Sequence, residues 1–341
     1  MNDKQLIFMA TPFRSGSALT SRILNANSQI GMICDKLKYF RFCYNRYNPL
    51  TEDNVYKMLN DVAIRLHGRF EISINVEECF KEIESKTNCD ASIYSTLLNH
   101  IFKETDKEII GEVECLGWSK IPVFLDMFPN SKALLIIRDL RDVVVSFKKL
   151  TFAPGDDYLI ALFNVIDAMD HFLEYQKKYP DRFYGIRYEA LKSNPEQEIV
   201  KICHFLGINF ETDMLDENNW TELKGNKWKN KAVSSFYIEG DHNNPVGRWR
   251  RLILPEDHYL CEWIGKAQLN KFGLETEGKG FTQDIIDSAV KKITSSKLLR
   301  ESFEHWCETG KGVEKYPLDP TKPENWDLSD VKNPELFNTV S

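Results

Sequence analysis

The 341-residue sequence lacks several patterns that would identify a common chemistry at once. Its eight cysteines include no C-x-x-C pair and no H-E-x-x-H motif occurs, so neither zinc nor redox chemistry is indicated. The motif G-x-x-x-x-G-K-[ST] is also missing. No apolar run approaches the roughly 20 residues of a membrane helix, and the segment 5–10 is too short for a signal-peptide core. We therefore expect a cytoplasmic protein without a metal or a membrane partner.

Basic residues are also fewer than acidic ones, 44 against 51. The net charge is −7 and the pI near 5.6, whereas proteins that bind nucleic-acid backbones need a basic surface to displace counterions. This balance excludes a general nucleic-acid binder. Any bound anion must be held by a local cluster of basic side chains.

What is present is an α/β pattern. Continuous apolar runs at 6–10, 108–113, 132–137 and 183–188 predict buried strands, and helical spacing of apolar residues follows from Leu19, from Val143 and over 158–177. Asn194, Pro195 and Gly207 mark the start and end of a further helix. Buried strands that alternate with helices predict a central parallel sheet flanked by helices.

We expect one domain over 1–341, because neither an internal repeat nor an interdomain linker is visible. Its core would span about 5–273. The segment of about 36–105 has no βα rhythm and is interpreted as a helical insertion on the acceptor side of the site. Residues 274–341 would form a helical extension and a proline-punctuated tail.

Two loops are suited to bind anions. In Thr11-Pro-Phe-Arg-Ser-Gly-Ser-Ala18 a glycine lies among small hydroxylated residues between a strand and a helix, so backbone N–H groups and the helix dipole converge on one point. Arg14 adds a planar fork of donors with a fixed charge. The second loop, with Arg138 and Ser146, directly follows another buried strand, where ligands collect in parallel sheets.

Four blocks of residues resemble the sulfotransferases that use 3′-phosphoadenosine 5′-phosphosulfate (PAPS). The blocks are Pro12-Phe-Arg-Ser-Gly-Ser-Ala-Leu19, Ile137-Arg-Asp-Leu-Arg-Asp-Val-Val-Val-Ser146, Ile186-Arg-Tyr-Glu-Ala-Leu191 and Val246-Gly-Arg-Trp-Arg250. The resemblance implies a P-loop NTPase-like fold, similar to that of the nucleoside kinases, and PAPS as co-substrate with adenosine 3′,5′-bisphosphate as product. This sequence departs from the family's pattern at Ala18 and at the additional Phe13. It also departs at Ile110-Gly-Glu-Val-Glu114, where many members have G-E-K-T-P.

Carried over by position, the resemblance implies a set of nucleotide-binding residues. The 5′-phosphosulfate would be held by Arg14, Ser15, Gly16, Ser17 and Ala18, the 3′-phosphate by Arg138 and Ser146, and the adenine would lie near Tyr188, under a closing loop of Gly247, Arg248 and Trp249. Arg14 would also neutralise the charge that develops on the transferring group.

The acceptor needs a general base to take its proton. In members similar to the tyrosylprotein branch a carboxylate follows the loop arginine at a spacing that lands on Asp35, which we rank first. Glu112 is second, because it lies toward the end of the predicted strand 108–113 and would face the same crevice, whereas Glu114 is expected on the other face. His242, in the closing loop, is third.

The prediction is therefore an enzyme that transfers a sulfuryl group in line to a hydroxyl or amine, most plausibly of a small molecule in specialised metabolism. Two alternatives share the fold: a P-loop kinase, and a module that binds the nucleotide without turnover. Aromatic side chains that could line an acceptor pocket, or else pack in the core, are Trp118, Trp220, Trp228, Tyr39, Phe40, Phe42, Tyr44 and Tyr47. The oligomeric state does not follow from the sequence.

Overall fold

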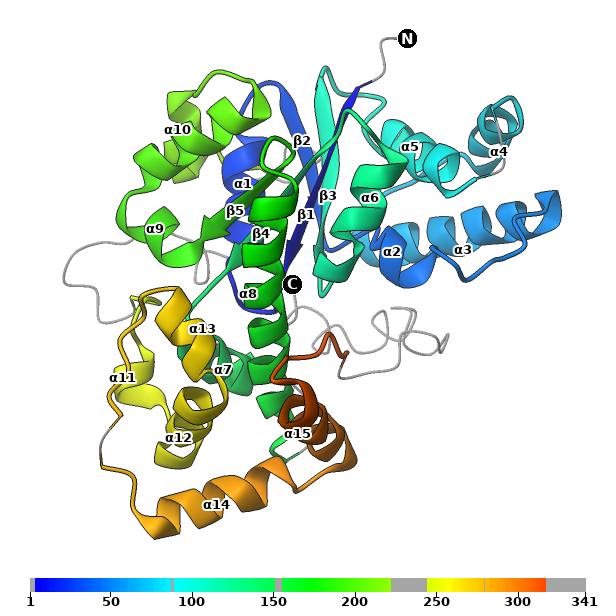
Figure 1. Ribbon diagram of the computed structural model, residues 1–341. Helices are drawn as coiled ribbons and strands as arrows, with labels where there is room; N and C mark the ends of the chain where they lie inside the picture. The colour runs from blue at the N-terminus through cyan, green and yellow to red at the C-terminus, as the bar shows by residue number, and fades with distance from the viewer. Residues whose placement is uncertain (1–3, 87–88, 151–154, 222–243, 279, 317–341) are drawn as a thin grey trace.

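A five-stranded parallel β-sheet forms the centre of the computed structural model, which describes residues 4–86, 89–150, 155–221, 244–278 and 280–316 (Figure 1). The strand order is β2-β3-β1-β4-β5, and each neighbouring pair runs parallel. The strands are β1 (Gln5–Thr11), β2 (Ile30–Cys34), β3 (Ile109–Cys115), β4 (Lys132–Ile137) and β5 (Phe183–Arg187). The α/β class and the parallel sheet expected from the sequence are confirmed.

Two details of the predicted strands were wrong. The edge strand β2 was not predicted, because it has only five residues and becomes a strand by pairing with the distant β3. Tyr188 was expected at the end of a strand, but it is the first residue of helix α9 (Tyr188–Ser193). Helix α10 (Pro195–Leu206) does begin with Pro195 and ends at Gly207, whose φ of 82° is readily adopted by glycine.

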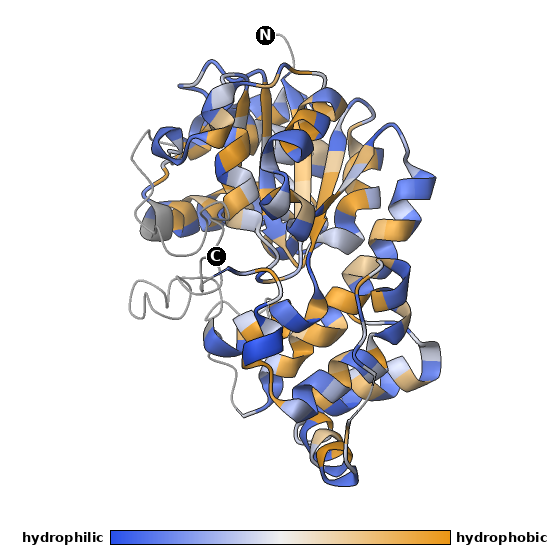
Figure 2. Ribbon diagram, turned by 90° about the vertical axis from the view of Figure 1, so that its left-hand side faces the viewer, coloured by the Kyte–Doolittle hydropathy of each residue, from blue (hydrophilic) through white to orange (hydrophobic). Residues whose placement is uncertain are grey.

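The alternation of side chains along β1 divides the core into two parts. Ile7 and Met9 face a cluster with α1 (Ser17–Asn25) and α10, whereas Leu6, Phe8 and Ala10 face a larger cluster. The larger cluster includes α5 (Asp90–Ile101), α6 (Ile121–Met127) and α8 (Ile160–Lys178). Figure 2 shows the apolar strands between these helical layers, whose outward faces are hydrophilic. A sheet buried on both faces explains why its strands are continuous apolar runs.

The segment between β2 and β3 is helical, as expected for the insertion. It contains α2 (Tyr39–Phe42), α3 (Glu52–Phe70), α4 (Val76–Glu84) and α5. The side chains of Thr51 and Asn75 cap α3 and α4 by accepting hydrogen bonds from backbone N–H groups. In Figure 1 these helices extend to one side of the sheet, beyond β3.

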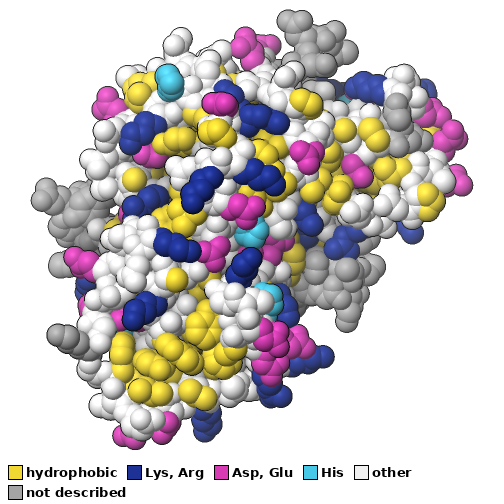
Figure 3. Space-filling model, viewed as in Figure 1, with side chains coloured by type: hydrophobic (Ala, Val, Ile, Leu, Met, Phe, Trp, Pro, Cys, Tyr) yellow, Lys and Arg dark blue, Asp and Glu magenta, His cyan; other side chains and the backbone are white. Residues whose placement is uncertain are grey.

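A second group of helices, most of them C-terminal to residue 248, lies beneath the carboxyl end of the sheet (Figure 1). They are α7 (Leu140–Leu150), α11 (Trp249–Leu252), α12 (Pro255–Ile264), α13 (Lys266–Lys271), α14 (Gln283–Ile293) and α15 (Lys297–Thr309). Short 3-10 turns are η1 (Trp118–Lys120), η2 (Asp157–Leu159), η3 (Thr212–Leu215) and η4 (Glu217–Asn219). Figure 3 shows a hydrophobic patch over this lower part and interspersed charges elsewhere on the same face.

Within the described ranges, none of the helices has the length and apolar character needed to cross a membrane. The division of the chain into core, insertion and extension stays a prediction.

Candidate functional site

Candidate site residues follow the carboxyl ends of the strands. Arg14 comes after β1, Asp35 after β2, Arg138 after β4 and Tyr188 after β5. The sheet order reverses at β1, since β2 and β3 lie on one side of it and β4 and β5 on the other. Such a reversal opens a crevice at the carboxyl ends of the strands, where ligands of open α/β sheets bind.

The loop after β1 has a backbone that favours anion binding. Arg14 adopts a φ of 63° and Gly16 a φ of 104°, and Gly16 precedes the first residue of α1. A Cβ at Gly16 would lie 2.4 Å from Cδ2 of Tyr188, so only glycine fits between the loop and this ring. The loop therefore directs the N-terminus of α1 toward the crevice.

The side chain of Arg14 contacts the second anion-binding loop. Its Nε donates a hydrogen bond to Oγ of Ser146 on α7, at 3.2 Å. The additional Phe13 stacks on Phe147 with ring centroids 5.4 Å apart, and both rings are buried. Phe13 therefore joins the loop to α7 beside the Arg14 to Ser146 contact.

Arg138 lies between the first loop and the closing loop. Its Nη1 donates to the backbone carbonyl of Arg14 at 2.9 Å, and its Nη2 donates to the carbonyl of Pro245. Its guanidinium lies over the ring of Tyr188, 4.7 Å from the centroid. The sequence suggested that Arg138 and Ser146 grip one phosphate together, which stays a prediction; in the structure the hydroxyl of Ser146 accepts from Arg14.

The closing loop is fixed by Asp142, which sequence reasoning did not select. Its carboxylate accepts hydrogen bonds from the backbone N–H groups of Gly247 (2.7 Å) and Trp249 (2.9 Å). The ring of Trp249 is buried beneath the guanidinium of Arg141, 3.8 Å from its centroid, so it packs in the core. The four-residue spacing of Arg138 and Asp142, which form an ion pair at 3.8 Å, was the available signal.

The electrostatics of the cluster favour an anion. Burial, then the charges of Arg138 and Arg248, lowers the pKa of Arg14 to about 10. The pKa of Arg248 is lowered too, by burial and then by Arg138. Oγ of Ser15 and Nε of Arg138 are buried without a hydrogen-bond partner among the described residues. Repelling guanidiniums and unsatisfied donors are what an anionic group would stabilise, so these residues fit the phosphates of a nucleotide.

Residues 7–212, more than half of the chain, match the profile of the family described as "Sulfotransferase family". The chain belongs to this sulfotransferase family. Among curated proteins it is similar to "Cytosolic sulfotransferase 16" of Arabidopsis thaliana, with 24% identity over 221 residues, 51% of this chain and 64% of the relative. The chain spans about half the length of the curated relatives that it matches.

Solved structures show the same fold. The sulfotransferase domain from the curacin biosynthetic pathway superposes with a TM-score of 0.52 at 19% identity, covering 80% of this chain and 98% of that domain. The sulfotransferase domain from the Synechococcus PCC 7002 olefin synthase has a TM-score of 0.52 at 18% identity, with 81% and 98% covered. At these identities the likeness concerns the fold alone.

In this sulfotransferase Asp35 lies at the carboxyl ends of β2 and β3. Its φ is 57°, it is 3% exposed, and one carboxylate oxygen accepts from the backbone N–H of Cys115 at 3.3 Å. The other oxygen forms an ion pair with Nζ of Lys38 at 3.3 Å. Lys38 is a site residue that the sequence did not reveal, because a lysine three residues after an aspartate is ordinarily a surface pair.

The predicted orientations of the two glutamates on β3 need correction. Glu114 was expected opposite Glu112, but residues two apart on a strand share a face. Both side chains have no exposed surface and accept from backbone N–H groups of α2, Glu112 from Tyr39 and Glu114 from Phe40. Glu112 thus faces the insertion, and the ranking of Asp35 before Glu112 as the base stays a prediction.

These buried carboxyls make stability depend on pH. Burial raises the pKa of Glu112 from the ordinary 4.5 to about 7, and burial, then the charge of Glu112, raises the pKa of Glu114. The folded chain therefore binds protons more tightly than the unfolded chain, and its stability should fall as pH rises from about 4.5 through about 7.

We expect Glu112→Gln to reduce this loss, because an amide has no charge to bury. The check is the melting temperature of both proteins between pH 5 and pH 8, with the exposed Glu304→Gln as control. Parallel curves for wild type and Glu112→Gln would contradict the assignment.

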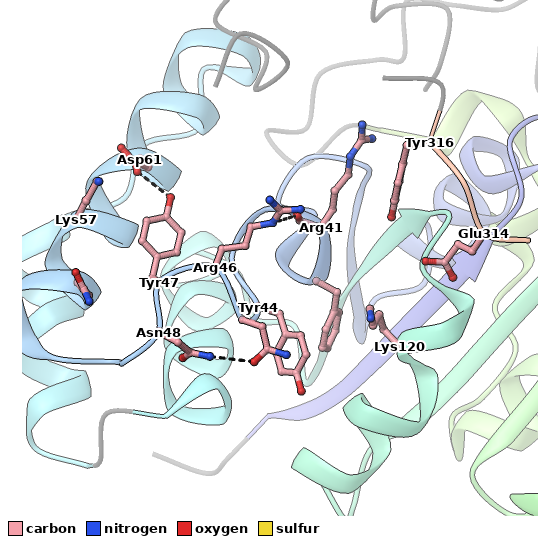
Figure 4. Close-up of a pocket in the computed structure, with 13 residues that line it drawn as sticks. Arg41, Tyr44, Arg46, Tyr47, Asn48, Lys57, Asp61, Lys120, Glu314 and Tyr316 are labelled. Carbon is pink, nitrogen blue, oxygen red and sulfur yellow. Dashed lines mark hydrogen bonds between the residues drawn. The ribbon is translucent and has the colours of Figure 1, made fainter. Parts of the chain in front are cut away.

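A cavity of about 770 Å³ lies between α2, α3 and the segment that follows α15 (Figure 4). Of the aromatic candidates, three line it: Phe40, Tyr44 and Tyr47. Four are instead buried in the cores: Tyr39, Phe42, Trp118 and Trp220. His242 and Trp228 lie outside the described residues.

Proposed function

We propose that this sulfotransferase moves a sulfuryl group from PAPS to a hydroxyl or amine of a small-molecule acceptor. The observation that carries the proposal is the convergence of Arg14, Arg138 and Arg248 on one crevice beside the Gly16 loop, where burial and then the charges of Arg138 and Arg248 lower the pKa of Arg14, and burial and then Arg138 lower the pKa of Arg248. A sequence with a net charge of −7 concentrates three buried or half-buried arginines there.

The donor would be held by residues of all three loops. Backbone N–H groups of Ser15, Gly16, Ser17 and Ala18 at the start of α1, with the hydroxyl of Ser15, suit the 5′-phosphosulfate. Arg138 suits the 3′-phosphate, and Ser146, through its hydrogen bond, orients Arg14. Tyr188, whose ring lies against the guanidinium of Arg138, suits the adenine. The loop of Gly247 and Arg248 would cover it.

The chemistry that these residues support is in-line transfer. Phosphoryl transfer and, by analogy, sulfuryl transfer depend mainly on positioning and charge neutralisation. Arg14, fixed by Ser146 and by its left-handed backbone, would present its guanidinium to the oxygens that gain charge.

Asp35 would take the proton of the acceptor. Lys38 and the N–H of Cys115 hold and orient its carboxylate. The thiol of Cys115 interacts electrostatically with both Asp35 and Arg14, which supports a common site for the proposed base and the arginine. Burial, then Asp35, raises the pKa of this thiol, so we expect it to stay protonated.

The test of nucleotide binding is Arg138→Ala. Removing this charge-assisted contact should weaken binding of adenosine 3′,5′-bisphosphate by about 1.5–3 kcal/mol, or roughly ten- to a hundredfold. Isothermal titration calorimetry measures it, with Arg300→Ala on α15 as control for charge. Unchanged affinity would refute the role of Arg138.

The same assay separates the alternatives. A bisphosphate-binding chain that transfers no sulfate to any acceptor would be the non-catalytic module, and magnesium-dependent hydrolysis of ATP would indicate a kinase-like enzyme. The cytoplasmic location and the absence of a required metal stay predictions; within the described residues no group of three His, Cys, Asp or Glu side chains is arranged to hold a metal ion.

A further inference from the structure

The cavity beside the insertion differs from the rest of this acidic protein in its charge. Four basic side chains line it, namely Arg41, Arg46, Lys57 and Lys120, against two acidic ones, Asp61 and Glu314. They come from α2, the turn after it, α3 and η1, and Figure 4 shows them on different sides of the cavity. A volume of about 770 Å³ is in the usual range for a small-molecule site.

The two acidic side chains are already engaged. Asp61 accepts a hydrogen bond from the hydroxyl of Tyr47 at 2.8 Å. Glu314 accepts from the backbone N–H of Ser119 at 3.1 Å, and burial raises the pKa of its carboxyl. The two carboxylates therefore already accept hydrogen bonds from Tyr47 and from the backbone of Ser119.

The four basic side chains form no ion pair with any carboxylate in the described part of the chain. Arg41 lies over the ring of Tyr316, 4.2 Å from its centroid, and its Nε is buried without a partner among the same residues. Nε of Arg46 donates to the backbone carbonyl of Arg41 at 2.5 Å, which holds the Arg46 side chain at the cavity, while the Arg41 side chain extends toward Tyr316 (Figure 4). Guanidinium and ammonium groups that line a cavity without an ion-pair partner provide donors for a carboxylate, sulfate or phosphate.

The cavity is joined to the proposed transfer centre by short links. The hydroxyl of Tyr316 donates to the carbonyl of Leu116 at 2.6 Å, and the preceding Cys115 donates its N–H to Asp35. On the other side, α2 begins one residue after Lys38, the partner of Asp35. Asp35 itself is not a lining residue, and the cavity is linked to the strand ends that carry it through Leu116 and α2.

We propose that this cavity is the acceptor site and that it selects small acceptors carrying an anionic group, with Arg46 and Lys57 as the recognition residues. The aromatic rings of Tyr44 and Tyr47 contact the body of the acceptor, and its hydroxyl points toward Asp35. This inference rests on the proposed function, and it adds the charge class of the acceptor.

The test compares acceptors that differ only in charge. Two series serve: 4-hydroxyphenylacetate, its amide and tyramine, and 4-hydroxybutyrate with its amide. Binding to the full chain saturated with adenosine 3′,5′-bisphosphate is measured by calorimetry, followed by kcat/KM with PAPS. We expect an acid to bind at least tenfold more tightly than its amide, with tyramine weakest.

The variant Arg46→Gln/Lys57→Gln should remove most of that tenfold preference while the amide and the bisphosphate bind as before. The matched control, Lys291→Gln/Arg300→Gln, removes two exposed charges from α14 and α15 and should keep the preference. Melting temperatures show that each variant is folded.

Three outcomes would overturn the inference: acids that bind no better than amides in both series, a preference that survives in the Arg46→Gln/Lys57→Gln variant, or tenfold tighter binding of an acidic tyrosine-containing peptide than of either small acid. Failure of the proposed function is distinguishable, because it would appear as loss of bisphosphate binding before any acceptor is added.

Discussion

Replacing Arg14 by alanine should lower kcat by about a hundred- to a thousandfold, the usual cost of losing one preorganised donor at a charged transition state. Arg14 combines a left-handed backbone, a hydrogen bond to Ser146 and a position beside Arg138 and Arg248. Its charge is therefore held in place before the reaction begins. Rapid-quench measurement of sulfate transfer gives kcat directly.

Arg14→Lys is the informative control. Lysine keeps the charge but loses both the planar fork and the Nε that contacts Ser146, so we expect partial recovery of turnover. Affinity for adenosine 3′,5′-bisphosphate should change less than kcat in both variants, since Arg138 and the backbone N–H groups of the loop remain. Full activity of Arg14→Ala would refute the central role of this residue.

Replacing Asp35 by asparagine should lower turnover by about a hundred- to ten-thousandfold, the contribution of a general base. Asparagine has the same shape, and its oxygen can still accept from the N–H of Cys115. Nucleotide affinity should therefore be preserved. Steady-state kcat of wild type and variant, with the affinity for adenosine 3′,5′-bisphosphate measured beside it, tests this.

Stability must be separated from chemistry in this variant. Asp35→Asn leaves the buried Lys38 without its partner, and such a loss typically costs about 3–5 kcal/mol. The double variant Asp35→Asn/Lys38→Met should recover melting temperature without recovering turnover. Glu112→Gln is the carboxylate control and should stay active. If Glu112→Gln loses turnover while Asp35→Asn keeps it, the base is Glu112.

Much of the fold could be predicted because its signals are local. Strands β1 and β4 are nearly continuous apolar runs, and helix α10 carries its own start and stop residues, Pro195 and Gly207. Strand β2 was not predicted because its extended state depends on pairing with β3. The residues of β3 are about 80 positions away in the sequence, so the residues around Ile30 carry no sign of this contact.

The sequence by itself determined the order of the loops and the residues that follow each strand, because parallel strands place their carboxyl ends at one edge whatever surrounds them. Only the tertiary structure decided which residues meet there. Arg14 contacts Ser146, Lys38 turns inward to Asp35, and Tyr316 joins Arg41 at the cavity. The physical reason is that charge pairing and cavity shape depend on groups distant in the chain, whose positions are set by packing rather than by local pattern.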